Sequence, residues 1–230
     1  DGSTDKTASI IQNLSFQKDN RFIFLRHEKN KGKGSAVLAG LERATGEYTI
    51  IQDADLEYDP NDIVVMFENA IKDSLPVVYG SRNLNRGNFR GTPMFYWGGR
   101  LVTLVANVLF NLSLTDAPTC YKLVKTDILK SLPLTCEGFE FCPQLTALLA
   151  KNNFLIKETA INYYPRNKIQ GKKISWRDGI WAVWELLRLR FKFSRDVYAA
   201  FLISGLIFFC YLFTWWGYFM GYEYETAKAS

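Results

Sequence analysis

The sequence predicts an α/β fold in which a mostly parallel sheet carries helices on both faces. Short β-branched and aromatic runs alternate with helix-like segments through the first half of the chain, which is the rhythm of consecutive βαβ units. Further along, residues 197–220 contain no charged side chain and are long enough to cross a bilayer. We therefore expect a globular domain over 1–165, a basic segment over 166–195 and a transmembrane helix over 197–220.

The expected elements of the first half follow one another in regular alternation. The chain starts at Asp1 with a turn typical of the end of a strand, so we expect a fragment that lacks its first strand. Ser3 or Thr4 is expected to cap a helix that runs to about residue 13, with Asp5 in its first turn. The elements expected next are a strand at 21–25, a helix at 35–44, a strand at 48–52, a helix at 60–71 and a strand at 76–79.

The second half of the chain alternates less regularly between strands and helices, and its polar residues indicate which helices are amphipathic. Residues 93–112 are rich in Leu, Val and Phe. A polar line at Thr103, Asn107 and Asn111 indicates an amphipathic helix, which would pack on the domain or lie at a lipid surface. The elements expected after it are strands at 121–125 and 156–163 on either side of a helix at 141–151, then an interfacial helix with apolar positions 176, 180, 184, 187 and 191.

Positive charge is concentrated just before the apolar stretch. Residues 166–195 hold nine Lys or Arg against two acidic residues, a net charge of +7, whereas the whole chain carries only +5. Nucleic acid and anionic lipid headgroups are two partners that such a segment can bind. Its position beside an uncharged span favours lipid, with the globular domain in the cytoplasm, and we expect no nucleic-acid partner. For residues 197–220, a buried core helix is the alternative to a membrane span.

Three carboxylates, those of Asp53, Asp55 and Glu57, follow the expected strand at 48–52 at alternate positions. In open α/β sheets, ligands bind at the carboxyl ends of the strands, so a site is expected here. Acids this close repel one another unless a cation lies between them. A divalent cation held by one or two carboxylates and by substrate phosphates fits the pattern, and a solvated acidic turn before Pro60 is the alternative.

Five short motifs occur along the chain: DGSTD at 1–5, NKGKGSA at 30–36, QDADLEYDP at 52–60, GSR at 80–82 and TDAPTCYK at 115–122. In this order they resemble family 2 glycosyltransferases, and within that family the dolichyl- or polyprenyl-phosphate sugar synthases. The resemblance covers nearly all of residues 1–193 and implies a GT-A fold, a nucleotide-sugar donor and inversion at the anomeric carbon. The chain departs from the pattern at Cys120, where relatives often have Gly.

The resemblance assigns roles to the acidic residues by their positions. Asp1 and Asp5 would lie in the nucleotide-binding loop. Asp53 and Asp55 would bind the nucleotide sugar through Mg²⁺ or Mn²⁺, and Asp55 would act in catalysis. Glu57 stands where many relatives have Gln, and it would be a further metal ligand.

Basic residues are candidates for contacts with phosphate groups. Lys33 lies between two glycines that allow a tight turn, so it would either contact the donor diphosphate or belong to a solvated loop. Arg82 follows a strand directly, and its guanidinium would bind the acceptor phosphate and act in catalysis, unless it is a surface arginine. Arg166, Lys172 and Lys173 would also bind the acceptor phosphate, and attraction of lipid headgroups is their alternative role.

A phosphate acceptor changes which residues the reaction needs. The second pKa of a phosphate monoester is about 6, so at neutral pH the acceptor is already anionic and needs no general base. We expect a metal-dependent, inverting glycosyltransferase that moves one sugar from a nucleotide sugar to a polyprenyl phosphate at the cytoplasmic face of a membrane. GDP- and UDP-linked donors are both compatible with these residues. The alternatives are a saccharide or another lipid as acceptor, and a catalytically silent membrane scaffold.

Overall fold

The computed structural model describes residues 1–13, 19, 21–88, 92–166, 175–191, 204–205 and 211. The chain divides into two compact units, residues 1–190 and 191–230, and the sheet described below belongs to the first. Within the described part of the chain, no helix is long and apolar enough to span a membrane. The span predicted at 197–220 lies outside the described residues except at positions 204, 205 and 211.

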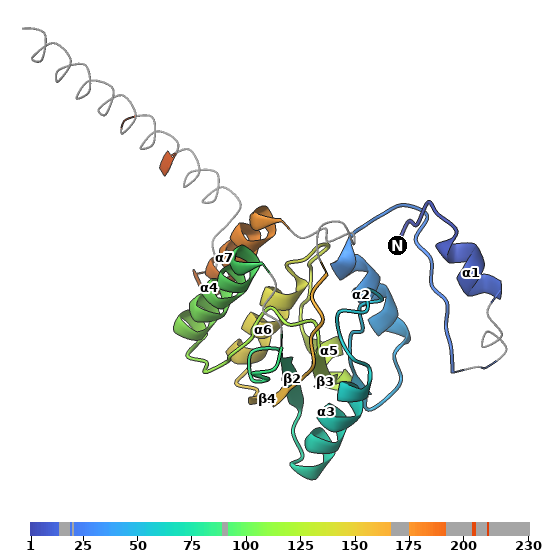
Figure 1. The fold of residues 1–230 in the computed structure, drawn as a ribbon, viewed down its shortest axis with the longest axis horizontal. Helices are drawn as coiled ribbons and strands as arrows, with labels where there is room; N and C mark the ends of the chain where they lie inside the picture. The colour runs from blue at the N-terminus through green and yellow to red at the C-terminus, as the bar shows by residue number, and fades with distance from the viewer. Residues whose placement is uncertain are drawn as a thin grey trace, which may run out of the picture. The chain divides into compact units, whose positions relative to one another are not determined.

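Four strands form one mixed sheet in the first unit (Figure 1). Their bounds are β1 Tyr48–Thr49, β2 Val77–Ser81, β3 Lys122–Lys125 and β4 Ile156–Ala160, and their order across the sheet is β1-β3-β2-β4. β2 and β4 pair in parallel, whereas β3 is antiparallel to β1 and to β2. The mixed α/β fold is confirmed, but the mostly parallel pairing is wrong for these strands. The chain leaves β2 and enters β3 at the same end of the sheet, where Tyr79 faces Lys122, so β3 has to run back.

Two strand predictions change in the structure. Residues 21–25 take no part in the described sheet, and their apolar side chains are exposed. A β-branched and aromatic run becomes a strand only where a neighbouring strand supplies hydrogen-bond partners, and no strand of this sheet pairs with it. The strand predicted at 48–52 is shortened to β1, and the one predicted at 156–163 ends at Ala160. Beyond that end, Tyr163 makes an isolated bridge with Tyr58.

Seven helices are found among the described residues. Their bounds are α1 Thr7–Asn13, α2 Lys33–Arg43, α3 Asn61–Lys72, α4 Pro93–Phe110, α5 Thr126–Ser131, α6 Phe141–Lys151 and α7 Trp176–Phe191. The helices predicted at 35–44, 60–71, 93–112 and 141–151 are confirmed to within two residues at each end, whereas α5 was not predicted. The cap of α1 also differs from the prediction, because Asp5 Oδ1, not Ser3 or Thr4, accepts the N–H of Thr7 at 2.9 Å.

Both faces of the sheet are covered, because alternate side chains of β2 enter two different apolar clusters. Val77 and Tyr79 belong to the larger cluster, which includes residues of α4, α6 and α7. Val78 belongs to the second cluster, with Met66 and Ala70 of α3. A strand sends successive side chains to opposite faces, so a strand buried on both faces needs little polar surface at any position. The prediction of helices on both faces is therefore confirmed, and the carboxyl ends of β1, β2 and β4 share one edge of the sheet.

Candidate functional site

Three acidic residues follow β1, and each is paired with a basic side chain of the same chain. Asp53 Oδ2 lies 2.7 Å from Lys33 Nζ. Asp55 Oδ2 lies 2.8 Å from Arg166 Nη2, and Glu57 Oε1 lies 3.4 Å from Nε of the same arginine. The repulsion that the sequence predicts among these carboxylates is thus compensated by the chain's own cations.

The acidic turn is fastened to the segment 163–166, which follows β4. Glu57 accepts the Tyr163 hydroxyl at 3.0 Å and the backbone N–H of Arg166 at 2.9 Å, and its side chain is only 9% exposed. The carbonyl of Glu57 accepts the N–H of Tyr164 at 2.8 Å. Leu56 adopts the left-handed conformation, with φ of 62°, which is costly for a leucine.

A cavity of about 700 Å³ opens beside this turn. Asp55, Tyr163 and Arg166 contribute to its wall. Three amide side chains line it as well, those of Asn85, Asn88 and Asn162. Small-molecule sites commonly have volumes of about 300–1,000 Å³, so the paired acid and arginine border a space of ligand size.

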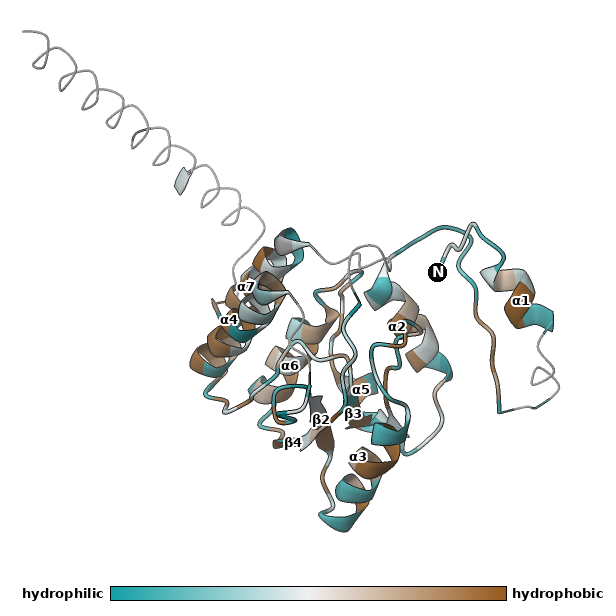
Figure 2. Cartoon of the chain, in the orientation of Figure 1, coloured by the Kyte–Doolittle hydropathy of each residue, from teal (hydrophilic) through white to brown (hydrophobic). Residues whose placement is uncertain are grey.

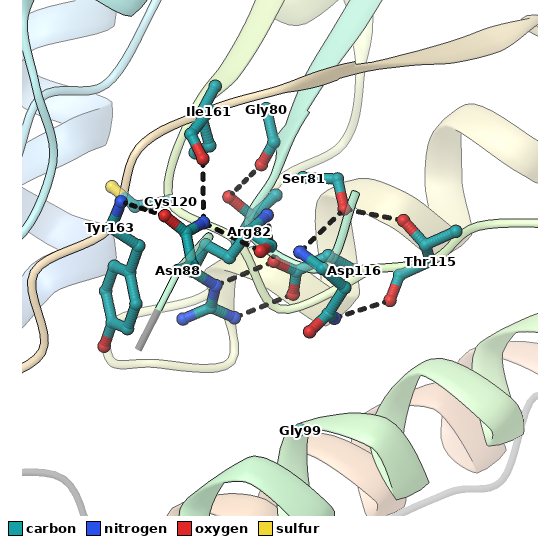
Figure 3. Close-up of polar contacts among 12 residues, drawn as sticks. Gly80, Ser81, Arg82, Asn88, Gly99, Thr115, Asp116, Cys120, Ile161 and Tyr163 are labelled. Carbon is teal, nitrogen blue, oxygen red and sulfur yellow. Dashed lines mark hydrogen bonds and ion pairs between the residues drawn. The ribbon is translucent and has the colours of Figure 1, made fainter. Parts of the chain in front are cut away.

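Arg82 lies at the end of β2 and is held by Asp116 (Figure 3). Asp116 Oδ2 accepts the backbone N–H of Arg82 at 2.9 Å and its Nε–H at 2.7 Å, and Oδ1 accepts Nη2–H at 2.7 Å. Burial alone would lower the pKa of Arg82, but the charge of Asp116 outweighs burial and raises that pKa well above its ordinary value. The guanidinium also lies 5.1 Å from the centre of the Tyr163 ring. Arg82 is therefore not a free surface arginine; its position is fixed by a buried carboxylate.

Lys33 begins α2 and lies against the acidic turn. Besides its ion pair with Asp53, Nζ lies 3.4 Å from Cys120 Sγ. Burial lowers the pKa of Lys33, but the Asp53 carboxylate is among the groups that outweigh burial and raise it, so the ammonium stays charged. The tight turn predicted before Lys33 is confirmed at Gly32, whose φ is +92°. A Cβ there would lie 2.4 Å from the carbonyl oxygen of Glu137, so only glycine fits.

Asp1 joins the N-terminal loop to the lysine-rich loop that precedes α2. Its carboxylate accepts the N–H groups of Lys31 at 3.0 Å and Gly32 at 2.8 Å, and it contacts His27 Nδ1 at 2.8 Å. His27 had no assigned role from the sequence, and the structure makes it a partner of Asp1. Asp5, the other acid predicted for a nucleotide-binding loop, lies at the start of α1.

The structure brings together only some of the predicted site residues. Lys33 joins Asp53, and Arg166 joins Asp55 and Glu57. Lys172 and Lys173 lie outside the described residues. Within the described ranges, no group of three or more His, Cys, Asp or Glu side chains is arranged to hold a metal ion. Both carboxylate oxygens of Glu57 are engaged, one by the Tyr163 hydroxyl and one by Arg166.

Sequence reasoning assigned no role to Tyr163 or Asp116, although both contact predicted site residues. Tyr163 lies three residues after β4, and Arg82 lies one residue after β2. β2 and β4 are parallel neighbours, so residues that follow their carboxyl ends meet at one edge of the sheet. Knowledge that β2 pairs with β4 would have identified Tyr163, but the local sequence does not reveal which strands pair.

Comparison with solved structures agrees with the fold described above. A crystal structure of glucosyl-3-phosphoglycerate synthase from Mycobacterium tuberculosis, in complex with Mn²⁺, UDP and glucosyl-3-phosphoglycerate, matches 82% of this chain and 66% of that one. The TM-score is 0.56 and the sequence identity is 16%, so the likeness concerns the fold.

Comparison of sequences identifies the family as well as the fold. The chain is 29% identical over 178 residues to a UDP-N-acetylglucosamine–dolichyl-phosphate N-acetylglucosaminyltransferase of Methanococcus voltae, covering 70% of this chain and 71% of that protein. It is 27% identical over 200 residues to the dolichyl-phosphate beta-glucosyltransferase ALG5D of Trichomonas vaginalis, spanning 82% of this chain and 59% of that protein. Residues 1–132, more than half of the chain, match the family model described as glycosyl transferase family 2. The chain therefore belongs to glycosyl transferase family 2.

Proposed function

We propose that this protein transfers one sugar, with inversion, from a nucleotide sugar to a polyprenyl phosphate at the cytoplasmic face of a membrane. The observation that carries the proposal is the set of charged side chains at and beside the cavity. Asp55 and Arg166 line the cavity as an ion pair, and Arg82 lies 5.1 Å from the ring of Tyr163, which also lines it. Such a site can bind a cation-bound diphosphate and a second phosphate close together. The two dolichyl-phosphate transferases among the relatives support the choice of acceptor.

The residues of the chain would act mainly by positioning two anions. Lys33 would attract the donor diphosphate, while Arg82 and Arg166 would face the acceptor phosphate and shield its charge from the donor. The acceptor phosphate is the nucleophile and is largely dianionic at neutral pH, because its second pKa is about 6. Catalysis then depends on holding the reacting atoms in line rather than on removing a proton.

The donor set of the acidic turn fits a hard divalent cation. Mg²⁺ and Mn²⁺ prefer carboxylate and phosphate oxygens, and one or two protein carboxylates are enough when the substrate supplies the rest. Asp53 and Asp55 would hold the ion, since their side chains are 30% and 23% exposed, whereas Glu57 is committed to Tyr163 and Arg166. The bound ion would stabilise the negative charge of the leaving nucleoside diphosphate.

Transfer to a lipid acceptor is the direct test of this proposal. Membranes containing the protein are incubated with radiolabelled nucleotide sugars and Mg²⁺ or Mn²⁺, then extracted with organic solvent. We expect label in a lipid from which mild acid releases the sugar, and none in membranes that lack the protein. Label confined to water-soluble glycans would instead identify a saccharide acceptor and overturn the proposal.

The exposed face of α4 supports action at a lipid surface. Met94, Trp97, Leu101, Leu104 and Val108 recur at steps of three and four residues, and each side chain is more than half exposed. Figure 2 shows apolar residues repeated along α4 and α7. α4 contains no acidic residue, so an anionic lipid surface would not repel it.

Polar substitutions on this face should weaken use of a lipid acceptor. We expect Leu101→Ser with Leu104→Ser to raise the apparent KM for polyprenyl phosphate in vesicles about tenfold, because burial of two leucines in lipid is lost. The KM for the nucleotide sugar should stay unchanged. The matched control replaces Val64 and Val65 by Ser, because these two side chains are exposed on α3, on the other side of the sheet. Equal effects of both double variants would contradict a lipid-facing α4.

A further inference from the structure

The loop between α4 and β3 is held in place by a carboxylate of β4. Glu158 Oε2 accepts the N–H of Thr115 at 2.7 Å, and Oε1 accepts the N–H of Asp116 at 2.9 Å. Two consecutive backbone amides of one loop thus bind the two oxygens of one side chain. Hydrogen bonds of amides to an ionised carboxylate are among the stronger ones in proteins, so Glu158 fixes this part of the backbone.

Other elements hold the rest of the same loop. Asn107 accepts the N–H of Leu114 at 3.0 Å and donates to the carbonyl of the same residue at 2.8 Å. Thr103 Oγ1 accepts the N–H of Ala117 at 3.1 Å, and the buried Lys122 Nζ donates to the carbonyl of Ala117 at 2.6 Å. Two residues of the polar line noted in the sequence, Thr103 and Asn107, therefore face this loop.

The hydrogen bonds that hold this loop also hold Asp116, which binds Arg82. Asp116 is 1% exposed, and it binds Arg82 through the backbone N–H, Nε and Nη2. Because Glu158 binds the backbone of Asp116 itself, it determines where the Asp116 carboxylate lies. The carboxylate in turn determines where the guanidinium of Arg82 lies (Figure 3).

The charges of this group are balanced. Arg82 and Lys122 are positive, and Asp116 and Glu158 are negative. Burial lowers the pKa of Lys122 to about 8, and the two carboxylates are among the groups that oppose this change. Loss of the Glu158 charge would leave two cations beside one carboxylate. Glutamine at position 158 would keep the size of the side chain but remove this charge.

We infer that Glu158 is a positioning residue for sugar transfer, which acts through the Thr115–Asp116 loop to hold Arg82 at the acceptor phosphate. The inference rests on the proposed function, in which Arg82 meets that phosphate. No sequence pattern separates Glu158 from the other acids of the chain.

The test compares steady-state kinetics of the wild type, Glu158→Gln, Glu158→Asp and the control Glu68→Gln. Glu68 is exposed on α3, so the control makes the same chemical change away from the loop. For Glu158→Gln we expect kcat to fall about tenfold to a hundredfold, because small displacements of a positioning group have effects of this size. The KM for the nucleotide sugar should change less than about twofold, and Glu68→Gln should match the wild type.

Combination with Arg82→Lys separates a positioning role from a general loss of structure. If Glu158 acts through Arg82, adding Glu158→Gln to Arg82→Lys should lower kcat little further, since interacting residues are not additive. The inference would be overturned if the double variant lost kcat by the product of the two single effects. It would also be overturned if Glu158→Gln had wild-type kinetics. If Glu158→Gln does not fold, the test uses Glu158→Asp instead. Aspartate keeps the charge, but its shorter side chain cannot reach the backbone amides of Thr115 and Asp116 in the same way. A wild-type kcat of Glu158→Asp would then overturn the inference.

Failure of the inference and failure of the proposed function have different signatures. A wild-type protein that labels no lipid contradicts the proposed function. A wild-type protein that labels lipid, together with Glu158 variants that match it, contradicts only the positioning role.

Discussion

Replacement of Asp55 by Asn should lower kcat for sugar transfer about a thousandfold, which corresponds to roughly 4 kcal/mol of transition-state stabilisation. Asn keeps the shape of the side chain, and its oxygen can still accept the N–H of Glu57 that Asp55 Oδ1 accepts at 3.1 Å. The turn should therefore stay folded. The variant loses the negative charge that now pairs with Arg166 and that would hold the metal ion. Radiolabelled lipid formed per unit time gives the rate.

A second measurement separates metal binding from turnover. Titration with Mn²⁺ alone, followed by calorimetry, should show weaker binding to Asp55→Asn than to the wild type. The matched control is Asp59→Asn, four residues away, where the oxygen that accepts the N–H of Asn61 at 2.9 Å is retained. The control should bind Mn²⁺ and turn over as the wild type does. Undiminished turnover of Asp55→Asn would show that the acidic turn does not hold the metal.

Replacement of Arg82 by Met should destabilise the protein by about 3 to 5 kcal/mol, because it leaves the buried carboxylate of Asp116 without its counter-ion. The size of the effect follows from the 1% exposure of Asp116, since an exposed ion pair contributes little. Urea unfolding followed by circular dichroism measures the change. Sugar transfer should be lost as well, because in the proposed function the guanidinium of Arg82 faces the acceptor phosphate.

The double variant Arg82→Met with Asp116→Leu distinguishes the two effects. With both charges replaced by apolar side chains, most of the stability should return, since a buried ion pair is often matched by apolar residues of similar size. Activity should not return. If Arg82→Met alone unfolds at the same urea concentration as the wild type, the pair is not a buried one in solution.

The sequence predicted the helices better than the sheet, for a physical reason. A helix forms its hydrogen bonds within one segment, so the apolar spacing of α3, α4 and α6 is enough to place them. A strand needs a partner that the local sequence does not identify. Residues 21–25 have the composition of a strand and take no part in the described sheet, while β3 is inserted between β1 and β2 against the expected direction.

The candidate site shows the same limit at the level of side chains. Asp53, Asp55 and Arg82 could be picked out because each follows a strand. The pairing of these residues could not be predicted, since Asp55 and Arg166 lie 111 residues apart in sequence and Arg82 and Asp116 lie 34 apart. The pattern of charges indicates Glu57 as a metal ligand, but it gives no sign that the same carboxylate binds Tyr163 and the backbone of Arg166.

The dependence of the acidic turn on residues 163–166 has a consequence for how the protein is made. The contacts that fasten Glu57 and Asp55 join positions 106 to 111 residues apart, so they form only after β4 has been synthesised and has paired with β2. Contacts of such long range form late, because the intervening chain must be ordered first. Until then the three acids lie together without Arg166. A nascent chain stopped before β4 would hold all three acids and lack both Tyr163 and Arg166, which fasten them.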